Sequence, residues 1–290
     1  MAYKVDNAVI MAAGLSSRFA PISYEKPKAL MTVKSEVLIE RQIKQLQAAG
    51  ITEIVVVVGY MKEKFEYLTK KFGVKLVENY EYATRNNNST IYAVKNHLKN
   101  TYICSADNYF EENPFESEVD DAYYAAVFVD GDTEEWCITY DENNTITDVT
   151  IGGCKKWVML GHAFWTKEFS DRFCEILESE YSKVETINKF WENLYIDHID
   201  ELKLKIKKYP DNYIYEFDSL DELRVFDTSY MNDTQSPIIK DVAKELNCEE
   251  SSLINFYPEK NSEGEVIGCT FELNNNHYKY NYKERKIYNA

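Results

Sequence analysis

Apolar segments of strand length alternate with segments of helical periodicity in the N-terminal part of the chain. Asn7 to Ala12, Ile54 to Val58 and Tyr102 to Ser105 have the continuous apolar character of buried strands. Val37 to Ala49 and Met61 to Phe72 carry apolar residues at helical spacing, and each ends at a glycine. This alternation predicts right-handed crossovers and a mainly parallel sheet, which is an α/β fold. We also expect a strand over Val74 to Val77 and a helix over Ser89 to Leu98.

The middle of the chain predicts that the sheet becomes mixed. Three strands separated by acidic turns, one of them "DENN", are expected over Ala122 to Val129, Cys137 to Tyr140 and Thr145 to Ile151. After Leu160 to Trp165 we expect helices over Lys167 to Tyr181 and Glu185 to Asp200, strands over Lys203 to Lys208 and Tyr213 to Phe217, and a helix in "SLDELRVFD".

The composition shifts to turn-forming residues at "YMNDTQSP", from Tyr230 to Pro237. We therefore expect a main domain over residues 1–231 and a small α+β domain over residues 232–290. The second part predicts a helix over Ile238 to Leu246 and antiparallel strands in "LINFYPEK", "EVIGCTFEL" and "HYKYNYKERKIYN". A domain of about 60 residues is marginal alone, so it should dock on the main domain or form a homodimer contact.

Charge and cysteine content exclude several classes of function. The 49 acidic and 33 basic residues give a net charge of −16, which disfavours nucleic-acid binding or docking on anionic lipid. The six cysteines include no C-x-x-C pair, so we expect reduced thiols in the cytoplasm rather than a zinc site or a disulfide framework. No apolar run approaches the length needed to span a bilayer, so no membrane insertion is expected.

The segment "MAAGLSSRFAPISYEKPKAL", Met11 to Leu30, follows the first expected strand. The turn after the first strand of an open α/β sheet is the usual place for a phosphate. Small residues there let backbone N–H groups approach phosphate oxygens, while Arg18 offers a fork of donors and Lys28 a point charge. The segment contains neither the Walker A pattern nor G-x-G-x-x-G. It therefore predicts a local anion site of another type in an acidic chain.

"AAGLSSR" with "KPKAL" resembles the signature of nucleotidyltransferases, which join a nucleoside triphosphate to a phosphorylated small molecule and release pyrophosphate. With "ITEIVVVVGY", "SADNYF", "EEW", "FWEN" and "IYEFDSLDEL", the chain is most similar to the bacterial CTP:phosphocholine cytidylyltransferases, over about residues 5–228. The resemblance implies a Rossmann-like nucleotidyltransferase fold and Mg²⁺-dependent transfer of CMP from CTP to phosphocholine, giving CDP-choline. Position 16 is a serine where many relatives carry glycine, and the tail after Pro237 lies outside the resemblance.

Phosphate transfer of this kind needs cations around the phosphates and carboxylates for a metal ion. Arg18 and Lys28 are the expected catalytic cations. Asp107 follows a buried strand at the active edge of the sheet and is the first expected Mg²⁺ ligand. Asp218 and then Glu216, two residues apart in "YEFD" and so on one face of a strand, are the next candidates. Ordinary turn or helix-capping roles for Asp107 and Asp218 are the alternative.

The resemblance also implies the remaining binding residues. An aromatic cage for a quaternary ammonium would use Trp136 and Trp191 as principal walls, with a nearby carboxylate as counter-charge. Such rings are more often core residues than ligand-binding ones. The nucleotide-binding candidates are Ala13, Gly14, Leu15, Ser16, Ser17, Gly59, Tyr60, Asn87, Ser89 and Asp107. The substrate-binding candidates are Tyr109, Trp136, Lys156, Phe190, Trp191, Glu192 and Tyr195.

Two alternatives to phosphocholine transfer remain open at this point. The same reaction could use phosphoethanolamine, 2-aminoethylphosphonate or a sugar 1-phosphate as acceptor, and Trp136 and Trp191 favour choline among these. A non-catalytic nucleotide sensor is the other alternative. The joint presence of Arg18, Lys28, Asp107 and Asp218 favours an enzyme, because binding alone does not require metal-binding carboxylates.

Overall fold

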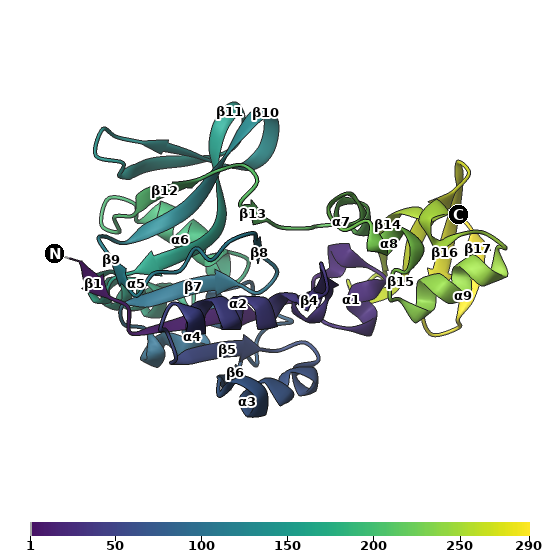
Figure 1. Ribbon diagram of the computed structural model, residues 1–290, viewed down its shortest axis with the longest axis horizontal. Coiled ribbons are helices and arrows are strands. Elements are labelled where there is room, and N and C mark those ends of the chain that lie inside the picture. The colour runs from purple at the N-terminus through teal and green to yellow at the C-terminus, as the bar shows by residue number, and fades with distance from the viewer. Residues whose placement is uncertain (1) are drawn as a thin grey trace. The chain divides into compact units, whose positions relative to one another are not determined.

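The computed structural model describes residues 2–290, which form two compact units (Figure 1). The first, here called the sheet unit, comprises residues 2–14 and Leu38–Glu216. The second, the loop unit, comprises Leu15–Val37 and Phe217–Ala290. The domain boundary expected between residues 231 and 232 thus lies inside the loop unit. Residues on both sides of that boundary pack with the segment from Leu15 to Val37, which sequence proximity alone does not reveal.

A seven-stranded mixed sheet is the centre of the sheet unit. Its strands are β2 (Asn7–Ala12), β5 (Ile54–Val58), β6 (Lys75–Glu78), β7 (Thr101–Ser105), β10 (Tyr123–Tyr140), β11 (Ile146–Trp165) and β12 (Lys205–Tyr209). The order is β12-β10-β11-β7-β2-β5-β6, and β7, β2, β5 and β6 run parallel. β11 is antiparallel to both neighbours. The mixed, mainly parallel α/β sheet is confirmed.

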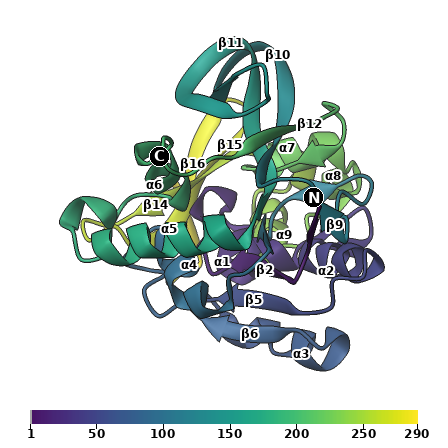
Figure 2. The ribbon, with the colours of Figure 1, turned by 90° about the vertical axis from the view of Figure 1, so that its left-hand side faces the viewer.

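Helices cover both faces of this sheet, as Figure 2 shows for α5 on one side and α2 on the other. Ile91, Phe173 and Trp191 join strand residues such as Val9 and Val57 in one buried cluster. The helices are α2 (Leu38–Ala48), α3 (Tyr67–Phe72), α4 (Asn88–Val94), α5 (Lys167–Glu180) and α6 (Trp191–Asp197), with short 3₁₀ turns at Lys62–Phe65, Lys95–His97 and Val184–Thr186. Two small sheets pair β1 (Tyr3–Lys4) with β9 (Glu118–Val119) and β8 (Tyr109–Phe110) with β13 (Ile214–Tyr215).

The middle of the chain differs from the prediction of short strands between turns. β10 and β11 are continuous strands of 18 and 20 residues, joined at the expected "DENN" turn. The acidic stretch from Asp130 to Glu135 is not a turn, because register shifts between Val129 and Asp132 and between Thr133 and Trp136 absorb it within the ladder. The ends of these strands form a long hairpin, here called the β10–β11 arm.

The loop unit combines the segment after β2 with the C-terminal part of the chain. Its helices are α1 (Ile22–Glu25), α7 (Leu220–Phe226), α8 (Ser229–Asn232) and α9 (Pro237–Glu245), with 3₁₀ turns η1 (Ser17–Phe19), η2 (Lys28–Leu30) and η6 (Glu250–Ser252). The hairpin β3 (Thr32–Val33) and β4 (Glu36–Val37) precedes α2. A four-stranded antiparallel sheet follows α9, formed by β14 (Ile254–Lys260), β15 (Val266–Leu273), β16 (Asn276–Asn281) and β17 (Lys286–Asn289).

Four strands stand where three were expected after Leu253. The last expected strand is a hairpin, because the chain reverses between Asn281 and Lys286 and Arg285 has a left-handed φ of 53°. We call residues 237–290, from α9 to the end of the chain, the C-terminal module.

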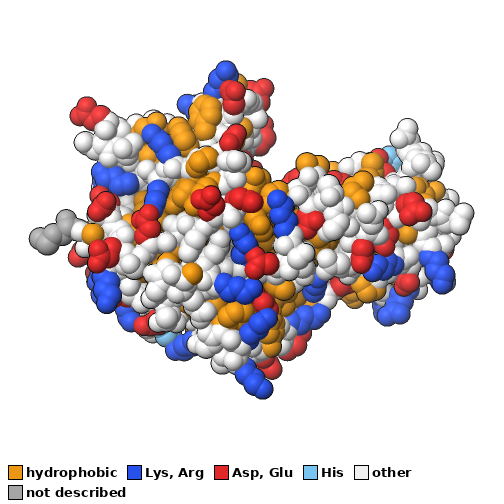
Figure 3. Space-filling view, in the orientation of Figure 1, with side chains coloured by type: hydrophobic (Ala, Val, Ile, Leu, Met, Phe, Trp, Pro, Cys, Tyr) orange, Lys and Arg blue, Asp and Glu red, His pale blue; other side chains and the backbone are white. Residues whose placement is uncertain are grey.

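The surface agrees with the composition. Acidic and basic side chains are interspersed over the face seen in Figure 3, and no broad basic surface appears there. Within residues 2–290, no helix combines the length and the apolar character required to cross a bilayer.

Candidate active site

The signature loop leaves β2 at Ala12 and begins in the sheet unit. The Ala13 carbonyl accepts a hydrogen bond from the Tyr60 N–H (3.1 Å), which ties the loop to the end of β5. A Cβ on Gly14 would meet no atom within 4 Å, so the backbone there is open. Gly59 is required for packing instead, because a Cβ would lie 2.7 Å from the Tyr82 ring. The segments that carry Gly14 and Tyr60 thus lie side by side, and their role in nucleotide binding stays a prediction.

In the loop unit the signature loop turns sharply. Leu15 is exposed, Ser16 has left-handed dihedrals (φ 48°, ψ 42°), and Ser17 begins η1. The left-handed region costs a residue with a side chain about 1 to 2 kcal/mol but is free for glycine. Glycine would therefore adopt this backbone conformation more readily than the serine found here.

Arg18, Lys28 and Asp218 come together in the loop unit although they are far apart in the sequence. An Arg18 guanidinium nitrogen lies 2.6 Å from a carboxylate oxygen of Asp218, and the Lys28 Nζ lies 4.0 Å from the other. The Arg18 side chain is 75% exposed, whereas that of Lys28 is 5% exposed and its Nζ lies 5.8 Å from the centre of the Phe19 ring. An exposed pair such as Arg18–Asp218 is worth only ~0 to 1 kcal/mol. Arg18 can therefore exchange Asp218 for a phosphate at little cost.

Asp107 follows β7 at the carboxyl edge of the sheet, as predicted. The turn is fixed by Gln42 of α2, whose side-chain amide donates to the carbonyls of Ser105 (2.7 Å) and Asn108 (2.8 Å). Gln42 is buried and was not predicted as a site residue, since its only sequence signal is a polar residue on the apolar face of an amphipathic helix. It holds Asp107 through the backbone on both sides.

Glu216 lies in the sheet unit, where its carboxylate accepts a hydrogen bond from the buried Asn108 amide (3.2 Å). The strand that was expected to carry Glu216 and Asp218 on one face ends at Tyr215, so this part of the prediction is wrong. Ser219 caps α7, and the chain before it is irregular. Among residues 2–290, no cluster of three or more Asp, Glu, His or Cys side chains forms a ready-made metal site.

Asn87 and Ser89 are both engaged in structural hydrogen bonds. The Asn87 side chain accepts from the Trp191 N–H (2.7 Å) and donates to the Glu192 carboxylate (3.2 Å). Ser89 is buried, donates to the Asn86 carbonyl (2.8 Å) and accepts from Asn79 (2.8 Å). Ser89 therefore has no free hydroxyl for a base or ribose in this structure. Asn87 orients the start of α6.

Glu192 is a half-buried carboxyl in the sheet unit. It accepts hydrogen bonds from Asn87 and from the hydroxyl of Tyr124 (3.3 Å), and no Lys or Arg of residues 2–290 pairs with it. Removal from water raises the pKa of Glu192 to about 7, and the two hydrogen bonds oppose this only in part. Tyr124 was not predicted, because a tyrosine in an apolar strand gives no sequence signal beyond packing.

Two aromatic rings meet near the start of α6, the helix that carries Glu192. Trp136 of the β10–β11 arm is half-buried and meets Phe190 edge-on, with ring centroids 5.9 Å apart and planes at 89°. Phe190 is exposed and precedes Glu192 by two residues. Lys156 is exposed on the same arm, in β11. Trp136 and Phe190 thus contact each other, and their role as a cage with Glu192 stays a prediction.

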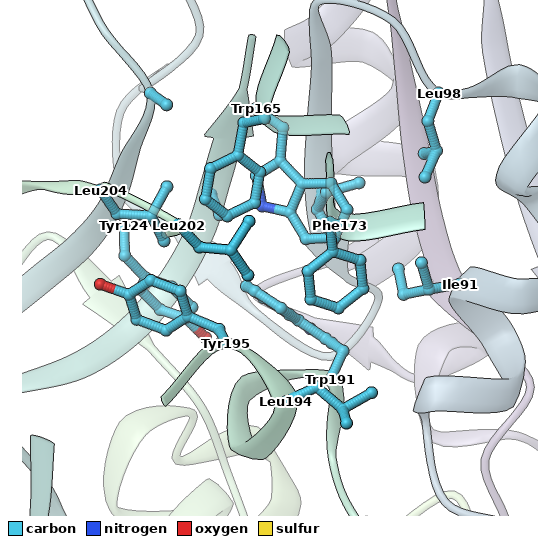
Figure 4. Close-up of a cluster of buried hydrophobic side chains, with 14 of the residues drawn as sticks. Ile91, Leu98, Tyr124, Trp165, Phe173, Trp191, Leu194, Tyr195, Leu202 and Leu204 are labelled. Atoms are coloured by element: carbon cyan, nitrogen blue, oxygen red, sulfur yellow. The ribbon is translucent and has the colours of Figure 1, made fainter. Parts of the chain in front are cut away.

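Trp191, Tyr195 and Tyr109 are core residues, contrary to the expected cage. Trp191 is 1% exposed and packs against Trp165, Phe173 and Tyr124, and Figure 4 shows it with Tyr195 inside the buried cluster. Tyr109 is covered by the Arg41 guanidinium, 4.5 Å from its ring centre. These three rings are core residues, which is the alternative that the sequence analysis gives for aromatic residues. They support the position of Phe190, Glu192 and Asp107 rather than offering ring faces.

Comparisons with known proteins agree with this geometry. Residues 8–123 match the MobA-like NTP transferase domain. The chain is 34% identical over 226 residues to choline-phosphate cytidylyltransferase of Streptococcus pneumoniae, covering 78% of this chain and 99% of that protein. It is 36% identical over 229 residues to 2-aminoethylphosphonate cytidylyltransferase of Lancefieldella rimae, covering 78% of this chain and 93% of that protein.

A solved structure gives the same result. The CTP:phosphocholine cytidylyltransferase of Streptococcus pneumoniae superposes with a TM-score of 0.74 at 35% identity, covering 77% of this chain and 97% of that one. The similarity extends over almost the whole length of these enzymes. The chain therefore belongs to the nucleotidyltransferase family that includes the choline-phosphate and 2-aminoethylphosphonate cytidylyltransferases.

Proposed function

We propose that this enzyme transfers CMP from CTP to phosphocholine, with Mg²⁺, to give CDP-choline and pyrophosphate. The choice of acceptor is supported by Glu192, a carboxyl with a raised pKa and no cationic partner, and by the ring contact between Trp136 and Phe190, which lies two residues before Glu192 in the chain. Desolvated carboxyls without a partner are costly and mark functional sites. A quaternary ammonium, which cannot donate hydrogen bonds, is held by ring faces and a nearby negative charge.

The groups of the loop unit suit the phosphate chemistry. An oxygen of the acceptor phosphate attacks the α-phosphorus of CTP, and the bond to the β,γ-diphosphate breaks to release pyrophosphate. Arg18 is exposed and can reach the leaving diphosphate, while Lys28 is buried and presents its charge from a fixed position. Fixed charges aimed at developing negative charge are the main source of rate enhancement in such reactions. Lys156 remains a candidate for the acceptor phosphate.

Mg²⁺ is supported by the chemistry of the donors rather than by a preformed cage. This ion usually keeps several waters and takes one or two carboxylates together with substrate phosphates, so a site of three protein ligands is not required. Asp107, with its backbone fixed by Gln42, and Asp218, beside Arg18 and Lys28, are the proposed ligands, and Glu216 is a third candidate. Bound Mg²⁺ would neutralise phosphate oxygens of CTP.

A second acceptor, 2-aminoethylphosphonate, is favoured by one specific finding, the 36% identity to an enzyme named for it. A primary ammonium would donate hydrogen bonds directly to Glu192 and would depend less on Trp136. The two acceptors differ in the methylation of nitrogen and in the link to phosphorus, which is C–O–P in phosphocholine and C–P in the phosphonate. Phosphoethanolamine differs from phosphocholine in methylation alone, so a comparison of all three acceptors separates the two effects.

The test is pyrophosphate release in the presence of Mg²⁺. CTP, UTP, ATP and GTP are each combined with phosphocholine, phosphoethanolamine, 2-aminoethylphosphonate and glucose 1-phosphate. We expect kcat/KM to be highest for CTP with phosphocholine. A higher value for 2-aminoethylphosphonate would replace the proposed acceptor. Ordinary enzymes turn over at about 1 to 10³ s⁻¹. If none of the sixteen pairs releases pyrophosphate at a rate in this range, the proposal is contradicted and a nucleotide sensor is favoured.

A further inference from the structure

The short helix α1 lies between Arg18 and Lys28 in the sequence and contacts the C-terminal module. The ring of Tyr24 stacks on that of Tyr282, with centroids 4.0 Å apart and planes at 20°. Tyr282 is buried and follows β16, whereas Tyr24 is 45% exposed. Stacked rings of this kind contribute roughly 0.5 to 1.5 kcal/mol beyond the area that they bury.

A second contact joins the next residue of α1 to the first turn of α9. The Glu25 carboxylate accepts a hydrogen bond from the backbone N–H of Ile238 (3.0 Å). The start of α9 is otherwise well fixed, since Pro237 is its first residue and the Ser236 hydroxyl accepts from the Ile239 N–H (3.1 Å). Glu25 thus satisfies an N–H group that the helix itself cannot satisfy, and the bond is charge-assisted. Lys28 lies three residues further along the chain.

The C-terminal module also contacts α7, which follows Asp218 in the chain. Arg224 of α7 is buried and donates to the carbonyls of Leu253 (2.7 Å) and Glu250 (2.7 Å), just before β14. β14 itself packs against both α7 and η1, the turn that contains Arg18. The carboxylate of Glu222 in α7 accepts from the Asp218 N–H (2.8 Å). One element therefore contacts the two segments that bring Arg18, Lys28 and Asp218 together.

We propose that the C-terminal module is a positioning element for catalysis, which fixes α1 and α7 and thereby the relative positions of Arg18, Lys28 and Asp218. Tyr24 and Glu25 are its positioning residues on the signature loop. The inference rests on the proposed function for its catalytic part. The matches to the two cytidylyltransferases each cover 78% of this chain, so about a fifth of it lies outside them. On this proposal, the C-terminal module positions Arg18, Lys28 and Asp218 and has no independent role.

The test uses point variants of the full chain. Tyr24→Ala and Glu25→Ala remove the stack and the acceptor, while Tyr24→Phe and Glu25→Gln keep them. Tyr288→Ala is the matched control, because Tyr288 is a tyrosine of the C-terminal module whose exposed fraction, 43%, is similar to that of Tyr24. Turnover, the KM of both substrates and the melting temperature are measured for each variant. Hydrogen exchange of the backbone amides in residues 15–30 gives a readout that does not depend on activity.

We expect Tyr24→Ala and Glu25→Ala to lower kcat by about tenfold or more, because small displacements of fixed groups are costly to rate. The KM for the acceptor and the melting temperature should stay close to those of Tyr288→Ala. The amides of residues 15–30 should exchange faster, and the Phe and Gln variants should behave as wild type.

Unchanged exchange in residues 15–30 would overturn the inference whatever the rates, and so would faster exchange with wild-type turnover. A rate loss that merely follows a lower melting temperature, or that Tyr288→Ala shares, would also overturn it. Failure of the proposed function is a separate result, because the wild-type enzyme would then release no pyrophosphate from any substrate pair while the exchange measurement still reports on the module.

Discussion

Glu192 holds its negative charge in surroundings that disfavour it, and this makes its role testable by pH. With a pKa of about 7, Glu192 is mostly neutral at pH 6 and mostly charged at pH 8. The KM for phosphocholine should therefore fall as pH rises through 7, by about tenfold relative to Glu192→Gln, which has no charge to gain. Comparison with the variant cancels the titration of the substrate phosphate. Parallel pH profiles for the two enzymes would remove Glu192 from the acceptor site.

The same carboxyl should cost stability when it ionises. Its folded-state pKa lies above the ordinary value of 4.5, so the native state retains a proton that the unfolded chain releases between about pH 4.5 and 7. Stability is therefore lost as pH rises through this range. The melting temperature of Glu192→Gln, relative to wild type, should increase from pH 5 to pH 8. A constant difference would mean that Glu192 is better solvated than its position indicates.

Ser16 is the second residue whose role can be tested, because its backbone is left-handed. Ser16→Gly should leave activity unchanged and stability equal or higher by up to about 1 kcal/mol, since relief of the backbone strain is offset in part by the greater freedom of glycine in the unfolded chain. Ser16→Val should be destabilising, because a β-branched residue tolerates this region poorly. Denaturant unfolding and turnover check both variants. A large loss of kcat in Ser16→Gly would instead assign the hydroxyl to phosphate binding.

Lys28 is the third residue whose role can be isolated. Lys28→Ala should lower kcat by a factor on the order of 10², because it removes a fixed charge from the transferring phosphate. Lys34→Ala is the matched control, since Lys34 is a nearby exposed lysine whose Nζ lies over the Phe226 ring. Steady-state kinetics with circular dichroism separates loss of rate from loss of fold. A near wild-type rate for Lys28→Ala would exclude it from the mechanism.

At the scale of elements, the β10–β11 arm carries Trp136, the proposed aromatic wall for the acceptor. Trp136→Ala should weaken the binding of phosphocholine by about 1 to 2 kcal/mol. This corresponds to a roughly five- to thirtyfold rise in the KM for phosphocholine, while the KM for CTP stays unchanged. Trp157→Ala serves as control, because Trp157 lies on the same arm and packs edge-on to Phe128, with centroids 5.5 Å apart. Equal effects on both substrates would show that Trp136 only supports the arm.

The elements also show what sequence patterns can and cannot predict. Continuous apolar runs such as Ile54–Val58 predicted parallel strands correctly, since burial on both faces requires such a run. The polar stretch of β10 was mistaken for a turn, because exposed antiparallel strands with bulges tolerate acidic residues. Motifs identified Arg18, Lys28 and Glu192, but the hydrogen bonds of Gln42 and Tyr124 depend on tertiary contacts that leave no local pattern.

For the whole molecule, metal dependence is the broadest expectation. Removal of Mg²⁺ with EDTA should abolish pyrophosphate release, and re-addition should restore it. Asp107→Asn should raise the Mg²⁺ concentration needed for half-maximal rate while its melting temperature without ligands stays near that of wild type. Calorimetric titration of Mg²⁺ with CTP provides the same comparison without turnover. Full activity in EDTA would refute the metal requirement, and an unshifted Mg²⁺ dependence in Asp107→Asn would remove that ligand.

The composition of the loop unit from two distant segments affects how the protein forms during synthesis. Arg18 and Asp218 are 200 positions apart, and residues 15–37 pack with residues 217–290. At roughly 5 to 20 residues per second, the ribosome reaches Asp218 about 10 to 40 seconds after it has made Arg18. Contacts of such long separation also close slowly. The signature loop is thus made long before residues 217–290, with which it packs in the loop unit.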